Sequence, residues 1–292
     1  MPNYRRRKNT GLLKVLGFSF GWAVIIGNTI GAGILRTPGE VASHLPNTWL
    51  FITAWLIGGI YALLGALSLT ELGVMIPESG GQYTFAKHAL GDYAGLIVGW
   101  SDWISTSGTS ALVSLVIAEY VGLLFGISNP IIGKAIALSV LVVFTLLQLR
   151  SIGVGSFVQN LTSILKALLF LMLITVCLLF SGDVNNLEIS VRPLATESIF
   201  TSMILALQSV IYTYDGWTGV IYFSEEVVVP ERDIPRSMIG GVVSVIIIYL
   251  FVNLALVYLL PVAQIAGKSL AIGYVMQIIF GKGSETFIQI LL

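Results

Sequence analysis

The sequence predicts an all-α integral membrane protein, and two features of the 292-residue chain support this fold class. Hydrophobic residues make up 56% of the chain and charged residues 10%, whereas soluble domains have about 45–50% and about 25%. Residues 15–35, 41–70 and 237–267 contain no charged side chain. Because about 20 apolar residues suffice for a helix to cross the hydrocarbon core, each of these runs is expected to span a membrane.

Turn-rich segments separate the predicted spans. Residues 126–130 and 181–186 combine Gly, Pro, Ser, Asp and Asn, which favour turns, whereas Lys166 stands alone within the apolar residues 161–180 and is placed at membrane depth. About seven complete spans are expected, and an eighth begins near residue 284. The seven lie at residues 15–43, 48–72, 95–125, 131–149, 155–180, 198–226 and 237–260.

The basic residues between the spans predict a cytoplasmic N-terminus. With that orientation, nine Lys and Arg residues lie inside and four outside. Those inside are Arg5, Arg6, Arg7, Lys8, Lys14, Lys87, Arg150, Arg232 and Arg236, and those outside are Lys134, Arg192, Lys268 and Lys282. The first apolar run has no A-x-A cleavage pattern, so no signal-peptide cleavage is expected. The prediction is a multi-pass protein of the cell membrane with residues 1–13 as a cytoplasmic tail.

Charge balance and cysteine content exclude several other classes. The 15 Lys and Arg residues equal the 15 Asp and Glu residues in number, so nothing indicates a nucleic-acid partner. Cys177 is the single cysteine, and His44 and His88 form no cluster with metal-ligand spacing. Neither a disulfide nor a metal or other cofactor is expected.

Two spans contain residues that interrupt a membrane helix. Three glycines lie within residues 27–33, and residues 212–219 contain an acid and two glycines. Glycines four apart, such as Gly27 and Gly31, also occur where helices pack closely in lipid, and this alternative stays open. A third glycine and a second interrupted span favour helix segments that unwind at the bilayer midplane. The residues assigned to the unwound segments are Gly27, Asn28, Gly31, Tyr214 and Gly216.

Unwound segments expose peptide groups, which are tolerated at membrane depth only where they line a cavity or meet a ligand. The N–H groups that open the outer half of the first span form a positive dipole end and suit a carboxylate, and carbonyls freed at the breaks suit an ammonium. The N–H groups are those of Ala32, Gly33 and Ile34, and the carbonyls are those of Thr29, Tyr212 and Thr213. A ligand with both charges is an α-amino acid, provided that the two breaks face each other.

Four motifs carry a family resemblance. They are residues 27–34 (GNTIGAGI), 77–83 (PESGGQY), 158–166 (VQN to Lys) and 224–236 (SEE to IPR). In this order they resemble the amino acid–polyamine–organocation transporters, and most of all the bacterial permeases related to the L-type amino acid transporters. The resemblance covers about residues 14–260.

This resemblance implies a LeuT-type fold of two inverted five-helix repeats and ten to twelve spans. Residues 14–182 would form the first repeat. Residues 183–292 would form part of the second, namely the sixth and seventh helices and the start of the eighth. The chain is therefore expected to be truncated at its C-terminus.

The resemblance also implies roles for individual residues between the broken first and sixth helices. Ala32 and Gly33 would meet the carboxylate of the substrate. The carbonyls of Thr29, Tyr212 and Asp215 would meet its ammonium, and the Tyr212 ring would close over it. The implied activity is secondary-active transport of an α-amino acid, of neutral type, by alternating access.

Two charged residues bear on coupling and substrate. By resemblance, Lys166 takes the place of a sodium ion and contacts the first helix near Gly27, so transport would be sodium-independent, by exchange or with protons. An ammonium at the bilayer centre costs about 2.5–3.5 kcal/mol or more, so it usually faces the bundle interior; snorkelling to an interface is the alternative. Asp215 replaces a glycine or apolar residue of the family, which makes a cationic amino acid or a polyamine the alternative substrate.

The sequence also bears on other functional classes. No constellation of nucleophile, base and acid is present in the sequence, so the protein is not expected to be an enzyme. A non-transporting amino acid sensor or a channel-like protein stays open, because discontinuous helices also line pores. The expected partners are the amino acid substrate and the lipid bilayer, and a single-span accessory subunit is left open.

Overall fold

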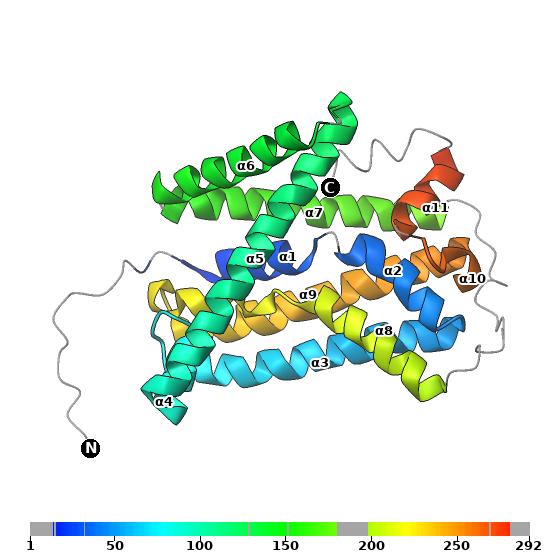
Figure 1. The fold of residues 1–292 in the computed structure, drawn as a ribbon. Coiled ribbons are helices and arrows are strands. Elements are labelled where there is room, and N and C mark those ends of the chain that lie inside the picture. Colours follow the sequence, from blue (N-terminus) through cyan, green and yellow to red (C-terminus); the bar gives the residue numbers. More distant parts are fainter. Residues whose placement is uncertain are drawn as a thin grey trace, which may run out of the picture.

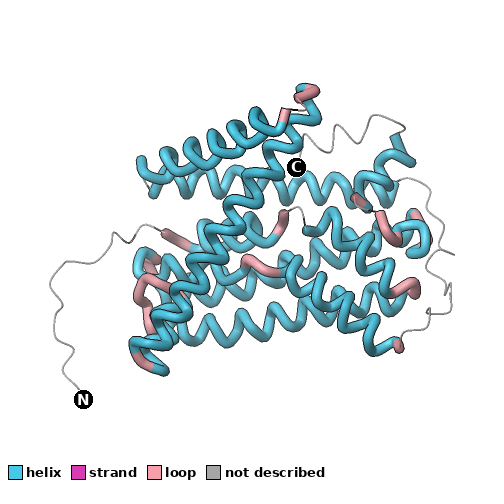
Figure 2. Tube along the Cα trace, in the orientation of Figure 1, coloured by secondary structure: helices cyan, strands magenta, loops and turns pink. Residues whose placement is uncertain are grey.

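The computed structural model describes residues 14, 16–31, 33–127, 129–150, 152–179, 198–268 and 270–280, and these are almost entirely helical (Figures 1 and 2). The elements in chain order are α1 (Phe18–Thr29), α2 (Gly33–His44), α3 (Thr48–Met75), α4 (Gln82–Leu90), α5 (Asp92–Phe125), α6 (Pro130–Arg150), α7 (Ile152–Leu179), α8 (Ile199–Tyr214), the 3₁₀ helix η2 (Trp217–Glu226), α9 (Pro230–Leu259), α10 (Val262–Ile265) and α11 (Ala271–Phe280). The predicted all-helical class is confirmed for these residues.

Four of the described helices are long and apolar enough to cross a membrane, and the bent pair α1 and α2 makes a fifth candidate. These five coincide with the predicted spans 15–43, 48–72, 131–149, 155–180 and 237–260. The helix α5 has 34 residues, but Ser and Thr are frequent in its middle, and it does not pass the same test. The total number of spans and the inverted repeat stay predictions, and the span expected near residue 284 lies outside the described residues.

Local sequence signals explain several helix ends. Asn47 caps α3, because its side-chain oxygen accepts hydrogen bonds from the backbone N–H groups of Trp49 and Leu50. Ser198 caps α8 in the same way through the N–H of Thr201. The left-handed Gly126, with φ of 65°, ends α5. The short helices α4, α10 and α11 were not predicted from the sequence.

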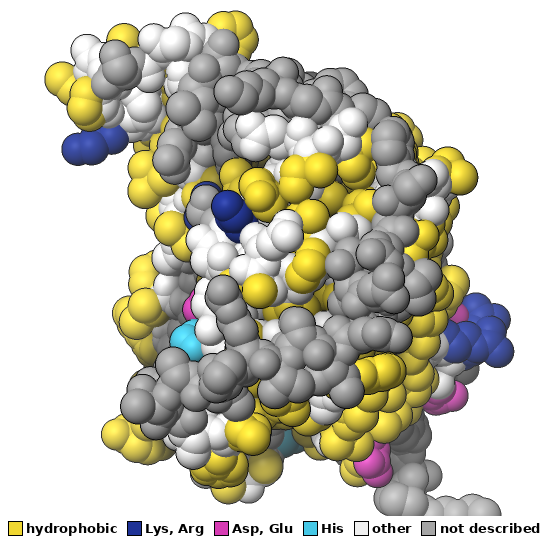
Figure 3. Space-filling view, turned by 90° about the vertical axis from the view of Figure 1, so that its right-hand side faces the viewer, with side chains coloured by type: hydrophobic (Ala, Val, Ile, Leu, Met, Phe, Trp, Pro, Cys, Tyr) yellow, Lys and Arg dark blue, Asp and Glu magenta, His cyan; other side chains and the backbone are white. Residues whose placement is uncertain are grey.

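The core of the described bundle lies between α1, α3, α8 and α9, which pack closely together, while α5 and α6 lie at its periphery (Figure 1). Three buried aromatic rings fill its centre: Trp55 of α3, Tyr214 of α8 and Tyr249 of α9, with ring centroids 4.9–6.2 Å apart. On the face shown in Figure 3, hydrophobic side chains cover much of the described surface and charged side chains are sparse. This surface suits a bilayer rather than water.

The chain ahead of α1 pairs with the chain that follows η2. The N–H of Leu16 donates to the carbonyl of Glu226 at 3.0 Å, and the N–H of Val228 donates to the carbonyl of Leu16 at 2.9 Å. This isolated parallel bridge between Leu16 and Val227 ties α1 to η2 at the end remote from both helix breaks.

Candidate functional site

The first break separates α1 from α2. The helix α1 ends at Thr29, Ile30 is extended with φ of −78° and ψ of 101°, and α2 begins at Gly33 with its axis bent by 47°. Gly27 and Asn28 lie in the last turn of α1, so the interruption starts after them and includes Gly31. Ala32 lies outside the described residues, and its part in carboxylate binding stays a prediction.

The second break separates α8 from η2. Tyr214 is the last residue of α8, Asp215 is extended, and Gly216 has φ of 115°. A side chain is rarely tolerated at such a φ, so the chain turns here because residue 216 is glycine. The Asp215 carboxylate accepts the N–H of Gly216 at 2.9 Å, and the N–H of Asp215 donates to the Tyr212 carbonyl at 3.2 Å.

The two breaks touch each other. A Cβ added to Gly216 would lie 2.8 Å from the carbonyl carbon of Asn28 and 3.0 Å from the N of Thr29, so the backbones meet where only glycine fits. A Cβ added to Gly33 would lie 3.2 Å from Cγ2 of Thr213, which places the start of α2 against the end of α8. A ligand with two charges could therefore meet both breaks at once.

Tyr249 of α9 joins the ends of both half-helices. Its buried hydroxyl donates to the carbonyl of Thr29 at 2.7 Å and lies 3.2 Å from the carbonyl of Thr213. These carbonyls belong to the ends of α1 and α8, where helical partners are missing. Because a hydroxyl has one proton and the bond to Thr29 is shorter, the Thr213 carbonyl keeps capacity for a further donor. Sequence reasoning missed this residue, since a tyrosine within the uncharged residues 237–267 carries no local signal.

The electrostatics of the site follow from these helix ends. The carbonyl ends of α1 and α8 are negative dipole poles and favour a cation, whereas the N–H groups at the start of α2 are a positive pole and favour an anion. Contacts of Thr213 with Tyr249 and of Gly33 with Thr213 bring the poles together. The arrangement can hold a small zwitterion through backbone groups.

The remaining predicted site residues occupy different environments. Ile34 is fully buried in the core, so only its backbone can face a ligand. Tyr212 is 68% exposed, whereas the neighbouring Tyr214 is buried and donates to the carbonyl of Trp55 at 3.2 Å; the predicted closure of the Tyr212 ring over the substrate stays a prediction. The Asp215 side chain is exposed beside the second break.

Lys166 of α7 reaches the last turn of α1. Its Nζ donates to the carbonyl of Gly27 at 2.9 Å, which is the contact that the family resemblance implied. On the same face of α7, Ser163 donates to the carbonyl of Ala23 at 2.7 Å, and Gln159 approaches the same oxygen at 3.4 Å. Among the described residues, no acidic side chain forms an ion pair with Lys166.

Gly27 also serves the packing of α1 against α7. A Cβ at this position would collide with the polar ends of the Ser163 and Gln159 side chains. Gly27 therefore allows α1 to pack closely against α7, as in the close-packing alternative, and its carbonyl also accepts the hydrogen bond from Lys166 of α7.

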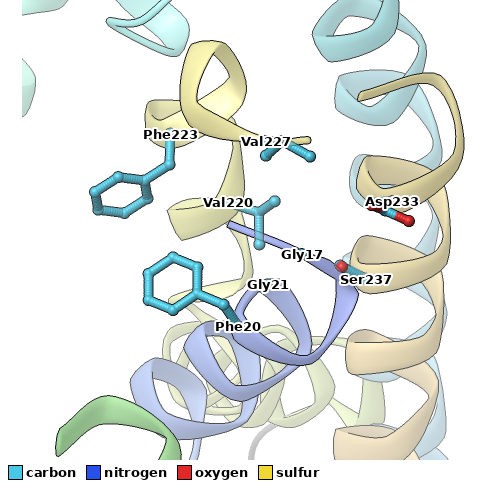
Figure 4. A pocket seen from close by; sticks show the side chains of 8 residues that line it. All are labelled: Gly17, Phe20, Gly21, Val220, Phe223, Val227, Asp233 and Ser237. Atoms are coloured by element: carbon cyan, nitrogen blue, oxygen red, sulfur yellow. The ribbon is translucent and has the colours of Figure 1, made fainter. Parts of the chain in front are cut away.

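A separate narrow hollow lies at the beginning of α1, between η2 and the first turns of α9 (Figure 4). The rings of Phe20 and Phe223 meet edge to face beside it at 5.6 Å, and Ser237 donates to the carbonyl of Phe18 at 3.1 Å. Since α1 has 12 residues and rises about 1.5 Å per residue, the hollow lies nearly a full half-helix from the breaks. It is therefore not the site that the breaks form.

Helix ends of opposite polarity meet here inside an apolar bundle, an arrangement also found in membrane carriers of small polar solutes. A family model described as amino acid permease matches residues 16–292. The chain belongs to this family, within the amino acid–polyamine–organocation superfamily, and its relatives are transporters rather than enzymes.

Named relatives cover most of this chain. It is 32% identical to the serine/threonine exchanger SteT of Bacillus subtilis (strain 168) over 262 residues, which are 88% of this chain and 58% of that protein. It is 31% identical to the b(0,+)-type amino acid transporter 1 of Mus musculus over 254 residues, 85% of this chain and 52% of that protein. It is 28% identical to the Asc-type amino acid transporter 1 of Homo sapiens over 265 residues, 85% of this chain and 49% of that protein. The chain thus spans about half the length of these relatives.

Proposed function

We propose that this chain forms the substrate-holding part of a secondary-active amino acid transporter that works by alternating access. The N–H groups of Ala32 and Gly33 bind the substrate carboxylate, and the carbonyls of Thr29, Tyr212 and Thr213 bind its ammonium. The observation that carries the proposal is the contact between the two breaks through Gly33, Gly216 and Tyr249. It brings helix ends of opposite polarity together, and peptide groups left free within a membrane span need a cavity or a ligand.

The proposed substrate is a neutral amino acid, carried without sodium. The Lys166 ammonium already sits on the Gly27 carbonyl and supplies the positive charge that a sodium ion would bring to the end of α1. Exchange is the proposed mode, in keeping with the relative named as a serine/threonine exchanger, and proton coupling through Lys166 is the alternative. The proposed location is the cell membrane, with the N-terminus in the cytoplasm.

A cationic amino acid or a polyamine is the second candidate substrate. The exposed Asp215 carboxylate lies at the second break, with its Oδ1 bound to the N–H of Gly216. A carboxylate there would attract a cationic side chain. Competition separates the two candidates: a neutral-substrate carrier is inhibited by alanine, serine or leucine, whereas a cationic one is inhibited by lysine, arginine or putrescine and loses that preference in Asp215→Asn.

Counterflow of labelled amino acid into proteoliposomes that hold the purified transporter of which this chain is the substrate-holding part tests the proposed function. A carrier accumulates label when the vesicles are loaded with unlabelled amino acid, and it does so with or without sodium. A channel conducts without such stimulation, and a sensor moves nothing, so either result would overturn the proposal. Counterflow by the purified protein alone would also show that a single-span accessory subunit is not needed.

A further inference from the structure

Beyond the breaks, α2 and α8 lie side by side (Figure 1). They meet through polar side chains. Gly33, Thr37 and Glu40 follow one face of α2, at intervals of four and three residues. Thr213 and Ser209, four residues apart, face them from α8. Each contact between these residues joins the helix that begins at the first break to the helix that ends at the second.

The direction of the hydrogen bonds is fixed by proton count. Oγ1 of Thr213 donates to the carbonyl of Ser209 at 2.9 Å. Its hydroxyl has a single proton, so in the 2.6 Å contact between Thr37 Oγ1 and Thr213 Oγ1, Thr37 is the donor. One turn farther along, Ser209 Oγ donates to Glu40 Oε1 at 2.8 Å. Two hydrogen bonds therefore bridge α2 and α8.

Thr213 is the residue where this bridge meets the candidate site. Its carbonyl lies at the cation-favouring pole beside Tyr249, and its side chain touches Gly33 at the anion-favouring pole. The hydroxyls of Thr37 and Thr213 are almost completely buried, with 6% and 4% of the residues exposed, so water does not compete for the bond. The Thr37 hydroxyl thus holds the position of one pole relative to the other.

We propose that Thr37 is a positioning residue that sets the separation between the carboxylate-binding start of α2 and the ammonium-binding end of α8. The hydrogen bond between Ser209 and Glu40 is a second contact that holds this separation. The inference rests on the proposed function and gives a structural basis for its substrate specificity. A fixed separation selects ligands by the distance between their two charges. A separation that matches the two charges of an α-amino acid would discriminate against a β-amino acid, whose amino group is one carbon farther from the carboxylate.

The test is binding of α-alanine and of β-alanine to the purified protein, measured as the ratio of their dissociation constants. In Thr37→Val, which keeps the shape and removes the donor, the affinity for α-alanine falls by about tenfold, the size of one lost buried hydrogen bond. The preference for α- over β-alanine narrows by a similar factor, because the poles are no longer held. Thr37→Ser, which keeps the hydroxyl, restores both values.

A matched control is Thr70→Val in α3, because the buried Thr70 hydroxyl has no hydrogen-bond partner among the described residues. It leaves the ratio at the wild-type value. Ser209→Ala removes the second contact with the loss of one atom and shifts the ratio in the same direction by about two- to threefold. The Ser209→Ala variant serves as the test if Thr37→Val does not fold.

The outcomes separate this inference from the function on which it rests. If the wild-type protein binds neither alanine, the proposed function is wrong and the positioning role goes with it. If the wild type prefers α-alanine and both Thr37→Val and Ser209→Ala keep the full preference, the proposed function stands and the positioning role is wrong. Loss of folded protein alone changes the number of binding sites, not the ratio.

Discussion

Removal of the Tyr249 hydroxyl tests the junction between the two broken helices. In Tyr249→Phe, the Thr29 carbonyl loses its 2.7 Å donor and the Thr213 carbonyl its 3.2 Å neighbour, both at buried residues. A buried acceptor left without a partner costs about 1–3 kcal/mol. Counting only the shorter bond, the ligand-free protein is expected to lose about 1–3 kcal/mol of stability, which is about 5- to 150-fold in the folding equilibrium.

The same substitution is expected to cost less when substrate is bound. The substrate ammonium supplies a donor to the carbonyls that the phenol has left, so stabilisation by saturating amino acid is larger in Tyr249→Phe than in the wild type. Unfolding of the purified protein, followed by fluorescence with and without amino acid, measures both quantities. Tyr61→Phe on the exposed part of α3 is the control and is expected to change neither.

Two results would refute this reasoning. If Tyr249→Phe unfolds like Tyr61→Phe, the hydroxyl does not hold the two carbonyls. If it is destabilised equally with and without amino acid, the ammonium does not reach those carbonyls, and the ammonium pole must lie elsewhere.

The other predictions concern the two glycines of the breaks and Lys166. Gly216→Ala is expected to destabilise the protein by more than about 1 kcal/mol, because residue 216 has a φ of 115° and an added Cβ would lie 2.8 Å from the Asn28 backbone. Gly133→Ala is the control, because open space surrounds Gly133 and no such loss is expected. Equal unfolding of the two variants would argue against the close contact at Gly216. Gly33→Val is expected to abolish amino acid binding while membrane insertion continues, and normal binding would remove the role of the α2 N–H groups. Lys166→Met is expected to change the cation or pH dependence of uptake, and an unchanged profile in both would exclude a coupling role.

The sequence located the breaks well but not their edges. Glycines at residues 27–33 predicted an interruption, but α1 continues through Gly27. Because Gly27 has no side chain, α7 packs closely against it, and Lys166 of α7 donates to its carbonyl. A run of glycines is compatible both with close helix packing and with an interruption of the helix. Only the neighbouring helix decides which glycine packs and which one bends the chain.

Site residues that lie far apart in the sequence could not be predicted from local motifs. Tyr249 sits 36 residues beyond Thr213 and 220 beyond Thr29, in an apolar helix whose pattern predicts nothing but a span. Thr37 likewise lies 176 residues from its partner Thr213. Tyr212, by contrast, was expected over the substrate; it is exposed at the end of α8, and its role stays a prediction. Motifs indicate local backbone geometry, and such long-range contacts follow only from the packing.

Competition by blocked amino acids tests the central claim most directly. Labelled alanine bound to the purified protein is displaced by unlabelled alanine, by N-acetylalanine, which lacks the ammonium, or by alanine methyl ester, which lacks the carboxylate. If peptide groups of both breaks grip a zwitterion, only unlabelled alanine competes, and each blocked compound is weaker by about 100-fold or more, since a charged hydrogen-bonding group is lost and its partners stay buried. Competition by either blocked compound at the strength of alanine would contradict the account.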